Sequence, residues 1–297
     1  MTTPNSATVP AAAPAITERD MLGALEVLDT ASTDPAELMI LTDEEIVGLD
    51  GGDSLELLGG PYLAQPGIDA DASAASAIRS LAARHLLTPT GDASDPEGDF
   101  VVGDEESPRR PFQLDRALAG VLALRRTPEV ITTIARTLAG GSTTLGHYVF
   151  PGGGVLEEYV TVDGFHHFSV PDLSVVPQRV HAFVDPFEDA SEDGDVEVLT
   201  VPGPDVDQVV EGARSLSVLT VVAEEAGAQA TVIAFPGRVR VLDNGPIRTD
   251  DDPVGCEISD VSPTGLRSII EALTPGRSAD DAGEPNDSRA GSGPSVQ

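Results

Sequence analysis

The sequence predicts an α+β fold in which two quasi-repeated units pack together, each a helix, an antiparallel β-meander and a second helix. First, residues 127–185 contain short runs of β-branched and aromatic residues between Gly and Pro clusters, a pattern typical of strands joined by turns. Second, residues 205–274 repeat the order of elements found in residues 111–184. Third, the closing segments FSVPDLSVVPQRVHAF and CEISDVSPTGLRSIIEAL both run from a strand through Asp and Pro into a helix with an Arg. Because a short meander leaves an apolar face and its edges uncovered, two such units would share a sheet or a core.

The chain preceding the first meander predicts a helix and a short strand at its start. Residues 16–28 predict a helix with Thr17 as its N-cap. Its expected apolar face consists of Met21, Leu22, Leu25 and Leu28. Residues 37–42, with the sequence ELMILT, predict a short buried strand. Residues 43–67 contain several leucines that must be buried. Glycines and prolines interrupt the segment, so no single helix or strand is predicted there.

Two further helices are predicted before the first meander, and an acidic segment separates them. Residues 73–87 predict a helix with Ala77, Ile78, Leu81 and His85 in register. Residues 92–106 hold seven acidic side chains and no basic one, which predicts an exposed loop. Residues 110–126 then predict a helix whose apolar set begins at Phe112.

The second unit follows another acidic segment. Residues 186–195 predict a solvated linker, and residues 205–216 predict a helix. Residues 189–200 have the early spacing of a calcium loop, but Thr200 stands where a bidentate Glu is needed, so the linker is favoured. The remaining expected elements are strands at 217–225, 228–236, 238–244 and 256–258 and a helix at 263–273.

These assignments divide the chain into five parts. Residues 1–15 and 275–297 are rich in small and polar residues and are expected to be disordered. The expected parts are a disordered arm (1–15), an N-terminal α+β half with the first meander (16–184), an acidic linker (185–204), a C-terminal α+β half (205–274) and a disordered tail (275–297).

The charge of the chain disfavours nucleic acid as a partner. Fifty acidic and 17 basic side chains give a formal net charge of −33, and every basic side chain is Arg. A phosphate backbone requires a basic patch, which is difficult to assemble in such a chain. The one candidate patch comprises Arg109, Arg110, Arg116, Arg125 and Arg126. Arg without Lys suggests a genome rich in G and C.

Composition also restricts location and chemistry. The single Cys256 excludes an intramolecular disulfide and a zinc site built from several cysteines. The sequence shows no signal-peptide pattern and no apolar run of the ~20 residues that a membrane span needs, so a cytoplasmic protein is expected. Without Lys, the chain cannot form a P-loop, a pyridoxal-phosphate Schiff base or a kinase site.

No residue pattern predicts catalysis or a cofactor. Cys256 lies in no catalytic motif, and no Gly-x-Ser-x-Gly sequence occurs. The histidines of the first meander, His147, His166 and His167, lie near Glu157 and Glu158 in sequence, which leaves a metal-dependent enzyme as an alternative. However, His166 and His167 are consecutive on a predicted strand and should point to opposite faces.

A glycine-rich hairpin is the candidate partner-binding site. Its residues are Phe150, Gly152, Gly153, Gly154 and Val155. Because the glycines lie between two strands rather than between a strand and a helix, they predict a turn and not a dinucleotide loop. An exposed apolar hairpin tip of this kind can contact a protein partner. A merely long turn is the alternative.

The order of elements resembles the EspG family, the cytoplasmic chaperones of the actinobacterial type VII (ESX) secretion system. The resemblance rests on the early strand ELMILT, the phrase LAARHLLTPTGD, the helix-to-strand step LALRRTPEVITTIARTLAGG, and the second sheet-plus-helix unit, over residues 16–274. It implies a non-catalytic protein that holds the helical tips of PE/PPE-type secretion substrates in solution. The acidic segments and the lack of Trp depart from the family pattern, and no contact residue is transferred.

A transcriptional regulator or ligand-sensing protein is the alternative from another class. Residues 76–100 can be interpreted as a helix followed by a wing, with the meander as a sensor domain. DNA affinity that falls with salt would distinguish this hypothesis from the chaperone.

Overall fold

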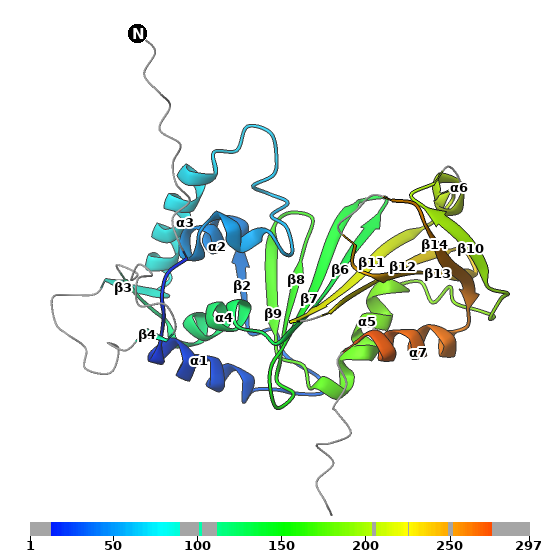
Figure 1. Cartoon of the computed structure of the whole chain (residues 1–297). Helices are drawn as coiled ribbons and strands as arrows, with labels where there is room; N and C mark the ends of the chain where they lie inside the picture. Colours follow the sequence, from blue (N-terminus) through cyan, green and yellow to red (C-terminus); the bar gives the residue numbers. More distant parts are fainter. Residues whose placement is uncertain are drawn as a thin grey trace, which may run out of the picture.

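A ten-stranded antiparallel sheet with helices on both faces forms the body of the protein, which confirms the predicted α+β class (Figure 1). This computed structural model describes residues 13–89, 101–102, 112–203, 206–224, 226–248 and 252–274. Two short ladders lie outside the large sheet. They pair β1 (Ile16–Thr17) with β4 (Val101–Val102) and β3 (Leu87–Pro89) with β5 (Phe112–Leu114).

Two meanders lie edge to edge in the large sheet. The first consists of β6 (Val130–Leu138), β7 (Gly141–Val149), β8 (Val155–Val160) and β9 (Phe165–Ser169). The second consists of β11 (Ser215–Ala223), β12 (Gly227–Phe235), β13 (Arg238–Pro246) and β14 (Val254–Val261). Their first strands, β6 and β11, pair antiparallel from Val130 opposite Ala223 to Thr137 opposite Leu216. The predicted units therefore share one sheet and are related by an approximate two-fold axis through this ladder.

Each meander gains one further strand at its outer edge. β2 (Met39–Thr42) pairs with β9, and β10 (Glu197–Val201) pairs with β14. The segment predicted to be a solvated linker therefore ends in a sheet strand. It also packs earlier, because Asp189 is 7% exposed and accepts hydrogen bonds from Arg214 and from the backbone N–H of Gly237.

The helices cover the two faces unequally (Figure 1). One face of the first meander is covered by α1 (Glu18–Leu28), α2 (Asp43–Asp50), α3 (Ala70–Ala83) and α4 (Arg116–Arg126). We call this side of the sheet the α4 face. On the second meander this face carries only the short α6 (Val206–Val210), which packs against Phe235 and Ile258. The opposite side, the α5 face, is covered by α5 (Val176–Val184) and α7 (Pro263–Leu273), which contact each other. Two 3₁₀ turns, η1 (Gly52–Leu55) and η2 (Leu173–Val175), complete the elements.

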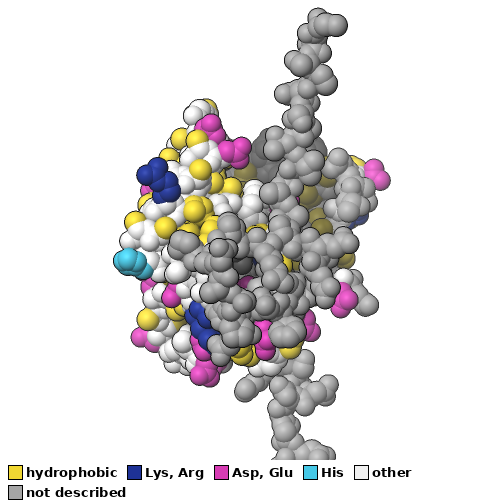
Figure 2. Space-filling model, turned by 90° about the vertical axis from the view of Figure 1, so that its left-hand side faces the viewer, with side chains coloured by type: hydrophobic (Ala, Val, Ile, Leu, Met, Phe, Trp, Pro, Cys, Tyr) yellow, Lys and Arg dark blue, Asp and Glu magenta, His cyan; other side chains and the backbone are white. Residues whose placement is uncertain are grey.

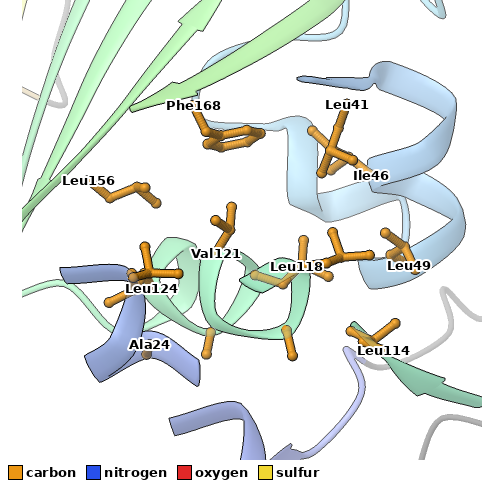
Figure 3. Close-up of a cluster of buried hydrophobic side chains, with 14 of the residues drawn as sticks. Ala24, Leu41, Ile46, Leu49, Leu114, Leu118, Val121, Leu124, Leu156 and Phe168 are labelled. Atoms are coloured by element: carbon orange, nitrogen blue, oxygen red, sulfur yellow. The ribbon is translucent and has the colours of Figure 1, made fainter. Parts of the chain in front are cut away.

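Helix α4 is the centre of the larger core (Figure 3). Its side chains Leu118, Val121 and Leu124 lie between the sheet residues Leu156 and Phe168 on one side and the other helices. All five side chains are at most 3% exposed. Asp115 caps the helix by accepting hydrogen bonds from Ala117 and Leu118. The helix begins at Arg116, and not at residue 110 as predicted, because Phe112–Leu114 forms strand β5.

The packing of α1 confirms Met21 and Leu28 of its predicted apolar face, which are half-buried against the larger core, but not Leu22 and Leu25. Thr17 caps this helix as predicted, in a capping box with Asp20. The buried face, however, contains Gly23, Ala24 and Val27. Leu22 is 43% and Leu25 61% exposed, and hydrophobic side chains are visible on this side of the molecule (Figure 2). Small residues form the contact because α1 crosses α4 closely.

The crossing of α1 and α4 depends on two facing glycines. A Cβ atom at Gly23 would overlap the carbonyl oxygen of Arg116, and one at Gly120 would overlap the backbone of Gly23. Backbone atoms cannot move aside as a flexible side chain can. Both positions therefore require glycine despite its low helix propensity.

Several other predicted boundaries change. Helix α3 ends at Ala83, and His85 is exposed with a left-handed φ of 61°, so it is not in the helical register. Residues 43–67 contain α2 and η1, and the helix predicted at 205–216 is reduced to α6 before β11 begins. Of the predicted disordered arm at 1–15, residues 13–15 are described and Ala15 is only 5% exposed. Residues 1–12, the tail at 275–297 and most of the acidic loop at 92–106 lie outside the described residues.

We expect Gly23→Ala to destabilise the protein by about 1–3 kcal/mol, because overpacking against the α4 backbone outweighs the gain in helix propensity. The free energy of unfolding, measured by urea denaturation, tests this. Gly52→Ala is the matched control, since a Cβ there meets no atom within 4 Å. Equal stability of the two variants would contradict the proposed glycine crossing.

Candidate partner-binding surface

An uncovered strip of the sheet lies on the α4 face, between the α1–α4 layer and α6 (Figure 1). Strand alternation and the registers of β6, β7, β11, β12 and β13 place its side chains together. We call this surface the central strip. Its residues are Thr133, Ala135, Thr137, Ser142, Thr144, Val218, Thr220, Val222, Gln229, Thr231 and Asn244. All are partly or fully exposed.

The central strip carries no charged side chain, although the chain contains 50 acidic residues. Six of its polar side chains pair with one another across the strands. Thr137 and Ser142 hydroxyls lie 3.0 Å apart, Gln229 donates to Thr220 over 3.1 Å, and Thr231 donates to Asn244 over 2.9 Å. Depletion of charge is typical of the centre of a protein interface. The strip spans the β6–β11 junction, so neither half could form it alone.

The glycine hairpin does not present the exposed apolar tip that was expected. Phe150 is 7% exposed and Val155 is fully buried, because each continues its strand into a core. Gly152 and Gly153 have positive φ angles of 82° and 84° and form the turn. Gly154 lies against Leu28 of α1. The two apolar residues are therefore unavailable to a partner, and partner binding by the glycines stays a prediction.

The histidines of the first meander are divided between the two faces. His166 points to the α4 face, where it contacts Glu158 and Asp43, and His167 points to the α5 face, where it contacts Glu37. His147 pairs with Glu157, also on the α5 face. The sheet thus places the pair His166 and Glu158 on one face and the pair His147 and Glu157 on the other, so the two pairs cannot share one metal ion. In the described ranges no three His, Cys, Asp or Glu residues are arranged to hold a metal ion.

A buried polar network links the sheet to the helical layer on the α4 face. His166 lies between two carboxylates, with Nδ1 2.6 Å from Glu158 and Nε2 2.9 Å from Asp43. The second oxygen of Glu158 accepts hydrogen bonds from Arg125 over 2.8 Å and from Tyr148 over 2.7 Å. Each of these five residues is at most 9% exposed. The network therefore ties α2 and α4 to β7, β8 and β9.

The charges in this network stabilise one another. Burial alone would raise the pKa of Glu158, but the Arg125 charge and the His166 hydrogen bond lower it to about 2. Burial opposes protonation of His166, yet its bonds to Asp43 and Glu158 raise its pKa above the ordinary value. Both ring nitrogens face carboxylate oxygens, which only accept hydrogen bonds, and this geometry favours the protonated form of His166. The network is therefore a structural cluster of charged groups.

A second network lies on the α5 face. Glu157 accepts two hydrogen bonds from the guanidinium of Arg179, one from His147 over 3.0 Å and one from Ser169 over 2.9 Å. Burial would raise the pKa of Glu157, but Arg179 and His147 lower it to about 2. This network fixes α5 against β8.

Sequence reasoning identified the histidines and glutamates but not Asp43 or Arg125 as their partners. Asp43 and His166 are 123 positions apart, so no local spacing connects them. Arg125 had been assigned to a possible basic patch, but it is buried against Glu158. Of the other members, Arg116 pairs with Glu26 and Arg126 bonds the carbonyl of Pro14, while Arg109 and Arg110 lie outside the described residues.

No protein-family model matches the chain, and no curated protein matches it. Within the described residues, no helix is long and apolar enough to cross a membrane.

We expect Glu158→Gln to destabilise the protein by about 3–5 kcal/mol, because it leaves the Arg125 and His166 charges buried without their shared partner. Urea denaturation at pH 7 measures the change. The matched control is Glu26→Gln, whose exposed ion pair with Arg116 should contribute no more than about 1 kcal/mol. A loss at Glu158 no larger than that of the control would contradict the network.

A second prediction concerns the loss of stability at acidic pH. The pKa of Glu157 is lowered from 4.5 to about 2 on folding, so its stabilising contribution is present above pH 4.5 and is lost as the pH falls towards 2. The stability gap between wild type and Glu157→Gln should therefore narrow between pH 5 and pH 2. Because wild type and variant are compared at the same pH, the effect of the overall net charge on their stability cancels. A gap that stays constant over this range would refute the prediction.

Proposed function

We propose that the protein is a non-catalytic chaperone or escort that binds a helical protein partner, as an EspG-like chaperone for PE/PPE-type substrates of type VII (ESX) secretion in the cytoplasm. The observation that supports this proposal is the uncharged central strip, an open part of the sheet between two covered regions. A flat, open surface of this kind suits a protein partner better than a small molecule, which prefers a concave site.

The chemistry of the central strip suits an apolar helical tip. Exposed Ala135 and Val222 supply methyl surface, and Thr220 adds a methyl group beside a hydroxyl that already has a partner. A partner that covers these groups desolvates no charge, which would otherwise be costly. Pre-paired hydroxyls also avoid the penalty of burying an unsatisfied polar group. The strip can therefore take an apolar partner at low desolvation cost.

The acidity of the remaining surface is consistent with an escort. A net charge of −33 keeps a protein soluble through mutual repulsion. A complex in which an aggregation-prone tip lies on the central strip would expose the acidic body to solvent. This combination of an uncharged contact surface and a strongly charged exterior fits the task of holding a substrate in solution.

A charge placed on the central strip should weaken partner binding. In Val222→Glu the new carboxylate would have to be desolvated, and we expect recovery of the partner to fall at least tenfold. The matched control is Val198→Glu on the edge strand β10, a more exposed position outside the strip, which should leave recovery unchanged. A tagged chain serves as bait in cytoplasm from its native source, with identification by mass spectrometry and reconstitution from purified components.

Stoichiometric recovery of a helical PE/PPE-type substrate that is lost only in Val222→Glu would support the chaperone. Equal recovery in both variants would place the contact elsewhere. Recovery of DNA whose binding falls with salt would overturn the proposal in favour of the regulator.

A further inference from the structure

A concave region lies on the α5 face, on the opposite side of the sheet from the central strip. This cleft has a volume of about 730 Å³. It is bounded by β6, β8 and β9, by α5, and by the segment at residues 33–37 that precedes β2. Its size falls in the range of about 300–1,000 Å³ that is typical of small-molecule sites.

Arg136 is the cation at this cleft that has no carboxylate partner among the described residues. Its guanidinium donates to the carbonyl of Phe183 over 2.8 Å and to the Thr143 hydroxyl over 3.4 Å, and its buried Nε atom has no hydrogen-bond partner. Burial without a neutralising carboxylate lowers the pKa of Arg136, with a small opposing effect of Tyr159. In a chain with 50 acidic residues, an unneutralised, half-buried Arg is unexpected.

The other cations at the cleft are already neutralised. Arg179 forms its ion pair with Glu157, and His167 lies 2.7 Å from Glu37. The positive charge available to a ligand is therefore concentrated at Arg136. Asp34 and Glu37 belong to the segment beside β9, and Arg136 lies on β6, three strands away in the sheet. The cleft thus has a cationic end and an anionic rim.

An aromatic wall connects these two ends. The Arg136 guanidinium lies over the Phe183 ring, 4.0 Å from its centre. Phe183 meets Tyr159 edge-on at 6.1 Å, and Tyr159 lies 6.1 Å from the His167 ring. These rings come from α5, β8 and β9, so the wall is held by three separate elements. A flat apolar body can stack on such a wall while its charged end reaches the guanidinium.

We propose that this cleft binds a small organic anion, a carboxylate carried on a flat aromatic or cyclic body. The carboxylate pairs with the Arg136 guanidinium, which has no carboxylate partner among the described residues. The ring of the ligand packs against Phe183 and Tyr159. Asp34 and Glu37 repel the carboxylate from the other end and so fix the orientation of the ligand. This site is independent of the central strip and of the chaperone function.

The test uses 1-naphthoate as the probe, because the chain contains no Trp to interfere with naphthalene fluorescence. Fluorescence titration of the full chain should show saturable binding at one site. The uncharged 1-naphthamide should bind at least tenfold more weakly, since it lacks the carboxylate. Inorganic phosphate, added as a competitor, distinguishes an organic-anion site from a general anion site and should not displace the probe at equal concentration.

Substitutions locate the site. Arg136→Gln should weaken 1-naphthoate binding at least tenfold, and Arg136→Lys, which keeps the charge but not the planar donor pair, should give an intermediate loss. Arg116→Gln, an Arg outside the cleft, is the control and should bind as wild type. Thermal melting establishes that each variant is folded, and Arg136→Lys decides the outcome if Arg136→Gln is not. Absence of saturable binding, equal affinity for the amide, efficient displacement by phosphate or wild-type affinity in both Arg136 variants would overturn the proposal.

Discussion

The antiparallel pairing of β6 with β11 is the interaction on which the architecture depends. It joins two meanders that would each be a small sheet with unprotected edges. Through this ladder the α5 face becomes one continuous surface, on which α5 and α7 can pack side by side. The same ladder also creates the central strip on the other face. The β6–β11 ladder thus both stabilises the body and forms its candidate binding surface.

The distribution of charge follows from the same organisation. Arg125, Glu158 and His166 are buried where the helical layer meets the first meander, and each has partners that compensate for its desolvation. Glu157, Asp185 and Asp189 are also buried, and each accepts hydrogen bonds. Between these regions, the central strip has neither buried ion pairs nor surface carboxylates. The protein therefore presents a neutral contact area within a strongly acidic exterior.

Local patterns were sufficient to predict the strands of both meanders, the capping of α1 by Thr17 and the closing helices, because alternation, turn residues and caps act within a few positions. They could not predict that β6 meets β11, that Gly23 and Gly120 face each other, or that Asp43 reaches His166, since these contacts join distant segments. The prediction of Leu22 and Leu25 on the buried face of α1 is wrong, because the close helix crossing favours small residues over leucines. For the candidate site, the hairpin residues Phe150 and Val155 were taken to be exposed, yet core packing buries them.

The approximate two-fold relation between the meanders has an evolutionary consequence. Two identical chains that paired through their first strands would form an isologous dimer, and a closed dimer of this kind must present the same groups on both halves. Fusion into one polypeptide removes that restriction. One half could then acquire the α1–α3 layer while its counterpart kept only the five residues of α6. The present asymmetry is what gene duplication followed by divergence would leave behind.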